Sequence, residues 1–402
     1  MAVSEIACAV FEKDLLMDIS HEDSRTKYSK YGPNYNVRNS YKYLPCQSFW
    51  TWITGKGIPL SNDEVAKAKK IPEELFLLKE LFVSWLLIVS FICTGFWSIN
   101  YAINSSMSIV ILFISWFFTV SCFRSLQAIF HYTTHGSIMK NMGRAKRYSL
   151  FFITTPILYV GWDDYRNAHV RHHHISNLCS GMDPDQIFIA KQKFRKGMPE
   201  FEYWLRVWLT PLKPNYIFNE IIFSLKNSFV IPSKIEIIFR VFFWLVSLFF
   251  LYFYNVFFEF IVLFVIPRFI IFPYSMWLQL FTEHLWFFEK DISCPRKESY
   301  GKLSWGRFQG RDLPDKKNMI IWIIKILLCD IPVRLFIYPK DLPNHDFHHR
   351  YAGVSYKKIA DLRVSMECKY KKYGPMREVW GFVSSLRVIR DHLCRNDVDP
   401  FI

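Results

Sequence analysis

Eight histidines of this 402-residue chain fall into three short groups, and a ninth stands apart from them. The groups read HYTTH at 131–135, HVRHH at 169–173 and HDFHH at 345–349, so the spacing within each is three or four residues. Residues at that spacing on an α-helix share one face and lie about 5–6 Å apart. Each group therefore predicts two or three imidazoles aimed at one point, as a metal ion requires. The nine candidate metal ligands are His131, His135, His169, His172, His173, His284, His345, His348 and His349.

Nine imidazoles are more than one ion uses. A structural zinc ion takes four protein ligands and a catalytic one takes three plus water, so nine predict two ions with open positions. Imidazole suits zinc, copper, iron and nickel alike, and ligand type alone therefore leaves the metal open. Three further histidines lie outside the pattern: we expect no metal at His174, and surface positions for His21 and His392.

The elements that position these histidines are long apolar segments. No charged residue occurs between Glu80 and Arg124, and a polar, uncharged patch at 98–106 divides that stretch. This predicts two membrane spans at 81–97 and 107–130, each near the ~20 residues that cross a bilayer. A second pair follows at 238–255 and 260–282. The alternative, two buried hairpins in a soluble helical core, fits such long aromatic runs poorly. The predicted fold class is an all-α membrane protein with four transmembrane helices in two hairpins.

The distribution of charge predicts the orientation of those spans. The net charge is +15, and the surplus lies in the loop 131–235, with fourteen Lys and Arg, and in the segment 285–402, with twenty-two. The positive-inside rule then places both termini and the long loop in the cytoplasm. All nine histidines would emerge on that side, in a cytoplasmic helical cap. A surplus confined to two stretches argues against a nucleic-acid binder, and 51% hydrophobic residues argue against disorder.

This topology divides the chain into three parts. We expect a cytoplasmic N-terminal segment at 1–74, a membrane domain at 75–360 and a cytoplasmic tail at 361–402. The weakly apolar pieces 148–160 and 318–338 have polar or charged flanks, which indicates interfacial or packed helices. Arg268, inside the fourth span, is either a functional group or a buried structural cation, and we favour the second interpretation.

Taken together, the three histidine boxes and the lone His284 around two membrane hairpins resemble the membrane fatty acid desaturase superfamily over about residues 75–360. That superfamily includes acyl-lipid and acyl-CoA desaturases, alkane and fatty-acyl hydroxylases, and carotenoid hydroxylases and ketolases. The resemblance implies a non-haem centre of two iron ions, with dioxygen as co-substrate. His131 and His135 match the first box, His169, His172 and His173 the second, His345, His348 and His349 the third, and His284 the isolated ligand after the last span.

Several details bear on the subfamily. The third box opens with His345 where front-end desaturases have Gln, and no HPGG core of a fused cytochrome b5 is present. The resemblance therefore implies a separate electron donor: ferredoxin, cytochrome b5 or a similar reductase system. The Glu283-His284 pair is similar to the alkane hydroxylase type as much as to the desaturase type, and Asp183-Pro-Asp185 is similar to members of the superfamily. We favour a fatty acid desaturase acting on a lipid acyl chain. The alternative is a hydroxylase or ketolase of a fatty acyl, alkane or carotenoid substrate.

Other classes of membrane metalloprotein fit less well. An intramembrane zinc protease needs HExxH, which occurs nowhere in the chain, and position 132 is Tyr. A metal transporter needs ligands at mid-bilayer, whereas these gather at one membrane face. The predicted location is a bacterial inner membrane or the endoplasmic reticulum.

Charged residues near the boxes are candidates for supporting roles. A ligating histidine usually donates its second N–H to a carboxylate or carbonyl, so one or two nearby acids suit that task. Arginines at the membrane face would hold an acyl headgroup or meet anionic lipid. The acids are Asp163, Asp164, Asp183, Asp185, Glu283 and Asp346, and the arginines are Arg166, Arg171 and Arg350.

Overall fold

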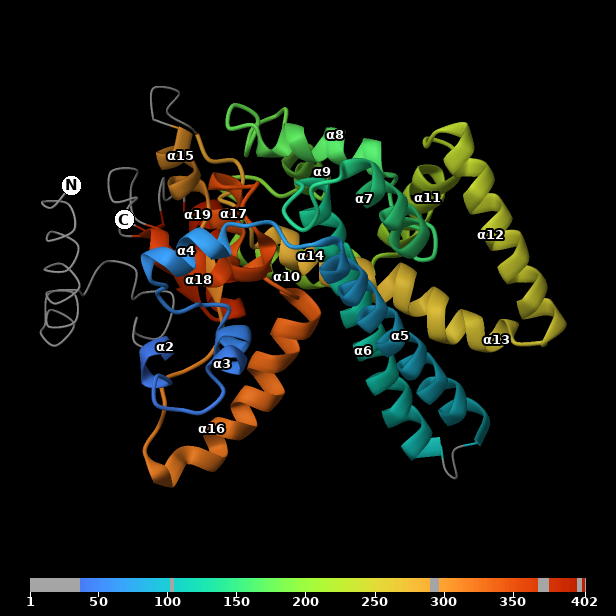
Figure 1. The fold of residues 1–402 in the computed structure, drawn as a ribbon, viewed down its shortest axis with the longest axis horizontal. Coiled ribbons are helices and arrows are strands. Elements are labelled where there is room, and N and C mark those ends of the chain that lie inside the picture. Colours follow the sequence, from blue (N-terminus) through green and yellow to red (C-terminus); the bar gives the residue numbers. More distant parts are fainter. Residues whose placement is uncertain (1–36, 102–104, 290–295, 368–375, 396–399, 402) are drawn as a thin grey trace, which may run out of the picture.

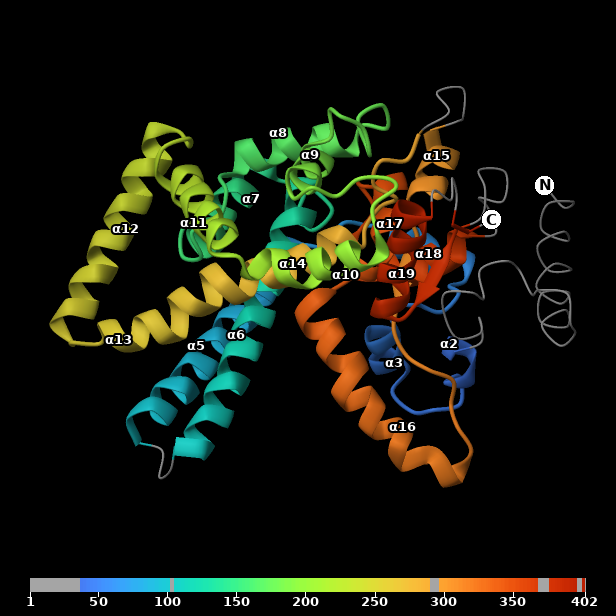
Figure 2. The same cartoon turned by 180° about the vertical axis from the view of Figure 1, so that it is seen from behind.

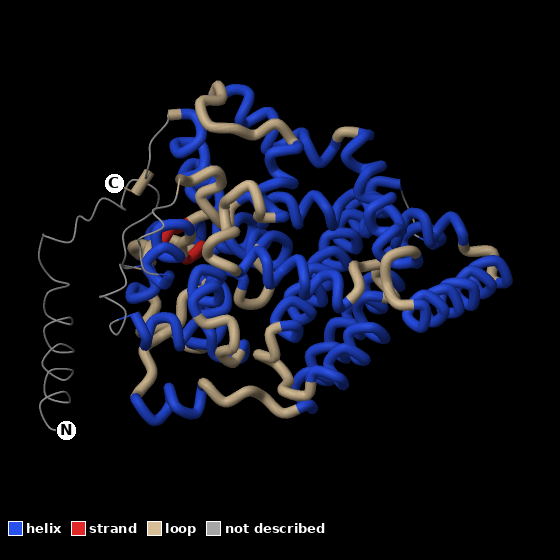
Figure 3. The backbone as a smooth tube through the Cα atoms, turned by 90° about the horizontal axis from the view of Figure 1, so that it is seen from above, coloured by secondary structure: helices blue, strands red, loops and turns tan. Residues whose placement is uncertain are grey.

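The computed structural model describes residues 37–101, 105–289, 296–367, 376–395 and 400–401, and this part of the chain is mostly helical (Figure 1). Its strands are β1 (Gly306–Phe308) and β2 (Glu378–Trp380), which pair in parallel with Arg307 opposite Val379. Figure 3 shows them as short red stretches of the tube among blue helices. The prediction of a helical protein is confirmed.

Four helices are long and apolar enough to cross a membrane, as the uncharged runs predict. They are α5 (Glu74–Tyr101), α6 (Ser105–Thr134), α12 (Lys234–Phe253) and the continuous helix Phe257–Phe281. The last consists of α13 (Phe257–Phe260), π-helical turns at Ile261–Val265 and Pro267–Ile271, and α14 (Phe272–Phe281). One third or less of each apolar window is buried within the protein, which leaves apolar surface for lipid. Helices α5 and α6 lie side by side in both views (Figures 1 and 2).

Most of the remaining helices form a body at one end of α5 and α6, whereas α16 extends away from this body in the same general direction as that pair (Figure 2). Before α5 lie α2 (Val37–Ser40), α3 (Gln47–Thr54) and α4 (Asn62–Ala68). Between α6 and α12 lie α7 (Met142–Ser149), α8 (Trp162–His173), α9 (Pro184–Lys191), α10 (Glu200–Leu209) and α11 (Pro214–Phe229). After α14 lie α15 (Arg296–Leu303), α16 (Met319–Lys325), α17 (His345–Arg350), α18 (Ile359–Glu367) and α19 (Phe382–Cys394). Single 3₁₀ turns occur at Thr210–Leu212, Lys316–Asn318, Leu342–Asn344 and Tyr356–Lys358, and further π-helical turns at Leu150–Thr154, Ile326–Asp330 and Val333–Ile337.

Side-chain caps fix where several of these helices begin. Ser61 and Glu64 form a complete capping box at the start of α4. The side chains of Asn141, Asp183 and Ser233 each accept a backbone N–H in the first turn of α7, α9 and α12. The cap of α9 therefore fixes the Asp183 side chain independently of any contact with a histidine.

Two apolar cores flank the region between α6, α8 and α17. One contains Trp277, Phe281 and Trp286, and the other contains Phe130 and Phe347. All five of these side chains are almost fully buried. Because packed cores of this kind resist deformation, the short histidine-bearing helices between them have fixed positions.

The two weakly apolar pieces do not appear among the candidate spans, as expected. Residues 148–160 contain the end of α7 and one π-helical turn, and 318–338 contain α16 with its π-helical continuation. Arg268 is buried and donates to the carbonyls of Ile157 and Leu158 and to Ser224 Oγ. These contacts agree with the interpretation of Arg268 as a structural cation.

Candidate metal centre

The nine predicted histidines come together in two groups. The first group contains five imidazoles and the second contains four, and one ring nitrogen of each member lies within 4.8 Å of those of the rest. The first group is His131, His135, His169, His173 and His348, and the second is His172, His284, His345 and His349.

Helix periodicity explains how two short helices serve both groups. On α8, His173 lies one turn after His169 and faces the first group, whereas its neighbour His172 faces the second. On α17, His348 faces the first group, and His345 and His349, one turn apart, face the second. Helices α8 and α17 therefore lie between the groups. The stacked rings of His173 and His349, with centroids 4.0 Å apart, mark where the groups meet.

His284 reaches the second group from a loop after α14. Its backbone forms an isolated antiparallel bridge with Ser304, and Leu285 N donates to Leu303 O at 2.9 Å. The imidazole is completely buried, with its centroid 4.7 Å from that of His349. Strand-like pairing thus supplies the rigidity that a helix supplies for the other ligands.

The buried imidazoles are suited to metal binding because they are neutral. Burial lowers the pKa of His135 to about 4, and it lowers the pKa of His169, His173, His284, His345, His348 and His349 as well. Among the described residues, Nε2 of His135, His169 and His173 and both ring nitrogens of His284 have no hydrogen-bond partner. Nε2 atoms face each other at 2.8 Å between His131 and His348 and at 2.9 Å between His345 and His349. Converging, unpartnered nitrogen donors are the set that two imidazole-bound metal ions need.

His172 differs from the others because carboxylates hold its second nitrogen. Its Nδ1 lies 3.0 Å from Asp183 Oδ1 and 3.3 Å from Asp185 Oδ2. Burial lowers the pKa of His172, but the carboxylates of Asp185 and Asp183 more than compensate and raise it to about 9. Asp183 is fixed in turn by the backbone N–H groups of Cys179 and Asp185. This contact orients the ring so that Nε2 faces the second group.

Asp183→Asn should weaken metal binding at the second group. Loss of a carboxylate that holds the second nitrogen of a ligating histidine typically lowers metal affinity by about 10–100-fold, so we expect a decrease of that size in the affinity for the metal. Competition with a chelator of known affinity measures the change. Asp163→Asn is the matched control, because Asp163 is exposed and pairs with Lys146. Equal affinities in the two variants would show that Asp183 does not support His172.

The other candidate acids take different positions. Glu283 Oε1 lies 3.7 Å from His345 Nε2 and 3.5 Å from Arg307. Asp346, beside His345, pairs with Arg363 at 2.9 Å. Asp163 and Asp164 lie in the first turn of α8, and no contact with a histidine is found for them in the described ranges. Of the candidate arginines, Arg166 and Arg171 are exposed on α8, whereas Arg350 is buried at the end of α17.

One supporting residue escaped the sequence analysis. Tyr165 Oη lies 3.0 Å from Nδ1 of His131, the position that a carboxylate occupies at His172. Tyr165 precedes His169 by one helical turn on α8, and that spacing is a signal that would have identified it.

The prediction that His392 lies at the surface was wrong. This side chain is completely buried on α19, with Nε2 3.0 Å from the carbonyl oxygen of Trp286. The helix packs an apolar face onto the core, and His392 lies on that face. His174 is exposed and belongs to neither group, as expected, and His21 lies outside the described residues.

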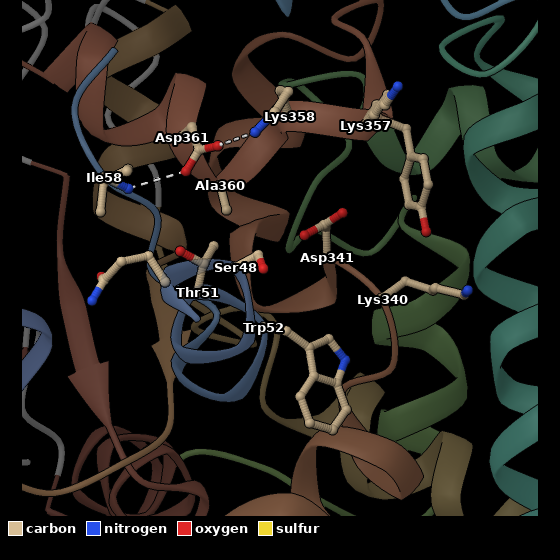
Figure 4. A pocket seen from close by; sticks show the side chains of 12 residues that line it. Ser48, Thr51, Trp52, Ile58, Lys340, Asp341, Lys357, Lys358, Ala360 and Asp361 are labelled. Carbon is tan, nitrogen blue, oxygen red and sulfur yellow. Dashed lines mark hydrogen bonds and ion pairs between the residues drawn. The ribbon is translucent and has the colours of Figure 1, made fainter. Parts of the chain in front are cut away.

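A pocket of about 320 Å³ lies apart from the histidines (Figure 4). Its lining includes Trp52, Lys340, Tyr356 and Asp361 and none of the nine predicted ligands. The ring of Tyr356 lies 4.9 Å from that of Tyr132, which lies 5.1 Å from His348. Two lysines of the lining are already paired, Lys358 with Asp361 and Lys340 with Glu80. Two tyrosine rings thus separate this charged pocket from the first histidine group.

Fold and site together define a helical protein with four candidate spans and two histidine groups. A family model described as fatty acid desaturase matches residues 106–380, which is more than half of the chain and includes all nine histidines. The chain therefore belongs to the fatty acid desaturase family. A comparison with curated proteins finds no match.

Proposed function

We propose that this protein is a membrane-bound, dioxygen-dependent oxidase with a di-iron centre, and that it desaturates a lipid acyl chain. The observation that carries the proposal is the division of nine histidines into groups of five and four. Nitrogen-only donor sets of this kind suit iron, and the family match supports iron over the other metals that imidazole binds. When bound, two iron ions would activate dioxygen strongly enough to take hydrogen from an unactivated carbon.

The overall reaction balances with an external electron donor. Desaturation removes two hydrogen atoms from neighbouring carbons, and dioxygen becomes two water molecules. Two of the four electrons come from the substrate, and two come from a carrier such as ferredoxin or a cytochrome b5 system, together with two protons. The described residues contain no contact that identifies this carrier, and it belongs to the proposal.

The protein's own contribution is to orient the ligands and exclude water. The Asp183 carboxylate holds His172, and Tyr165 holds His131. Tyr132 and Trp286 are completely buried beside the first and second groups, with ring centroids 5.1 Å from His348 and 5.2 Å from His284. An apolar chain would replace solvent against such walls, which protects a reactive oxidant from water.

We further propose a topology for this chain. Two hairpins would leave both termini and the histidine cap on the cytoplasmic side, of a bacterial inner membrane or of the endoplasmic reticulum. Residues 1–74 and 361–402 would be cytoplasmic segments around the membrane domain. The supporting observation is the excess of Lys and Arg in 131–235 and 285–402.

Mass spectrometry of lipids from cells with and without the protein tests the reaction. We expect a product that is lighter than its precursor by two hydrogen atoms. A gain of one oxygen atom would instead identify a hydroxylase, the alternative reaction. Lipids identical in both cells, under conditions in which the protein holds iron and receives electrons, would contradict both activities.

A further inference from the structure

Arg124 is a completely buried arginine inside α6 whose donors are only partly used. Its Nη2 donates to Gln279 Oε1 and to the carbonyl oxygen of Ile337. Its Nε and Nη1 have no hydrogen-bond partner among the described residues. Arg334, equally buried, donates from all three nitrogens to backbone carbonyls. Arg240 and Arg307, which are also completely buried, each have one nitrogen without a partner among the described residues, whereas Arg124 has two.

The surroundings of Arg124 have more positive than negative charge. Arg124 and Arg307 are both completely buried, and the carboxylate between them is that of Glu283. Gln279 connects Arg124 to Glu283, since its amide nitrogen donates to Glu283 Oε1. An unpaired buried cation is strongly unfavourable, so one negative charge is missing from this trio.

The position of Arg124 relates it to the metal centre. Arg124 precedes His131 by seven residues, which places both on the same face of α6, about 10 Å apart along the helix. Gln127 lies between them, and its amide nitrogen donates to Tyr159 Oη at 2.9 Å. Its Oε1 is buried and has no partner in the described chain. A polar stripe thus continues from the first histidine group toward the membrane.

We propose that Arg124 binds an oxygen acceptor of the substrate, a carboxylate in preference to a neutral carbonyl. This inference rests on the proposed function, because it places the acceptor relative to the oxidised carbon. The backbones of Arg124 and His131 are about 10 Å apart along α6, so an acceptor bound at Arg124 fixes the substrate relative to the first histidine group. Nε and Nη1 lie on different edges of the guanidinium, so each can donate one hydrogen bond to an oxygen of the substrate, and the excess positive charge favours a carboxylate. Arg124 is thereby a specificity-determining residue that sets which carbon is oxidised.

Binding of octadecanoate and of octadecane to purified protein under anaerobic conditions tests the proposal without turnover. The ratio of the two affinities is compared between variants, so that partition into detergent cancels. Arg124→Met should reduce the ratio of the affinity for octadecanoate to that for octadecane by about 10–100-fold. This is the fold-change in affinity that corresponds to the loss of one hydrogen bond to a charged group. Arg268→Met is the matched control, because Arg268 is a buried arginine of another span with protein acceptors for its donors, and its preference should stay unchanged.

A second substitution covers loss of folding. If Arg124→Met yields no folded protein, Arg124→Lys decides, because it keeps the charge but loses the planar guanidinium with its separate Nε and Nη1 donors; we expect a several-fold weaker preference for the acid. An acid preference that is unchanged in the folded variant would overturn the role of Arg124. This outcome is separate from failure of the proposed function, which would appear as wild-type protein that prefers the acid but oxidises no lipid.

Discussion

His348→Ala should lower the metal content from about two ions per chain to about one and abolish turnover. His348 is central to the first group, with ring centroids 4.6 Å from His131, 4.5 Å from His135 and 4.9 Å from His173. Substitution by alanine removes the imidazole that α17 contributes to the first group and leaves a buried void there, so the side of the site facing α17 is left without a donor. Elemental analysis of purified protein gives the metal content, and product formation gives the turnover.

The neighbouring histidine supplies the control for this experiment. His174 is exposed, and its Nδ1 contacts Ser176 Oγ at 2.6 Å, outside both groups. His174→Ala should keep both ions and full turnover. Two ions and undiminished turnover in His348→Ala would exclude the first group as a required metal site. Stoichiometric zinc in fully active wild-type protein would instead contradict the assignment of iron.

Local periodicity made the grouping of the candidate ligands predictable from the sequence. The i, i+3 and i+4 spacing needs only a helix to bring imidazoles to one face, and uncharged runs need only a bilayer to become spans. Both features depend on residues that are close along the chain. The structure brings together all nine predicted histidines and has four helices suited to span a membrane.

The division of the nine candidate ligands into groups of five and four could not be predicted from the sequence, because it depends on how helices distant along the chain pack together. His172 and His173 are adjacent on α8 yet face different groups, and the partner groups come from α17, far along the chain. Pairs such as Arg124 with Gln279, or β1 with β2, join segments with no shared local pattern. His392 illustrates the same limit, since its burial follows from the packing of α19 and not from its own polarity.

Arg363→Met should destabilise the protein strongly, because it leaves two buried carboxylates without their shared cation. Arg363 is completely buried on α18, and it donates to Asp346 Oδ2 and to Glu378 Oε1, each at 2.9 Å. Breaking a buried pair by removal of one partner costs about 3–5 kcal/mol. For a chain of 402 residues we therefore expect a fall in Tm of about 4–6 °C, measured by thermal unfolding in detergent.

The location of Arg363 extends this effect to the metal centre. Asp346 is in the first turn of α17, next to His345, so the ion pair fixes the helix that carries three candidate ligands. Metal content should consequently fall together with Tm. Arg195→Met is the matched control, because Arg195 forms a similar pair with Glu202 on the exposed surface, where salt bridges contribute little. If both variants melt at the wild-type temperature and keep two ions, the Arg363 pairs do not hold α17 in place.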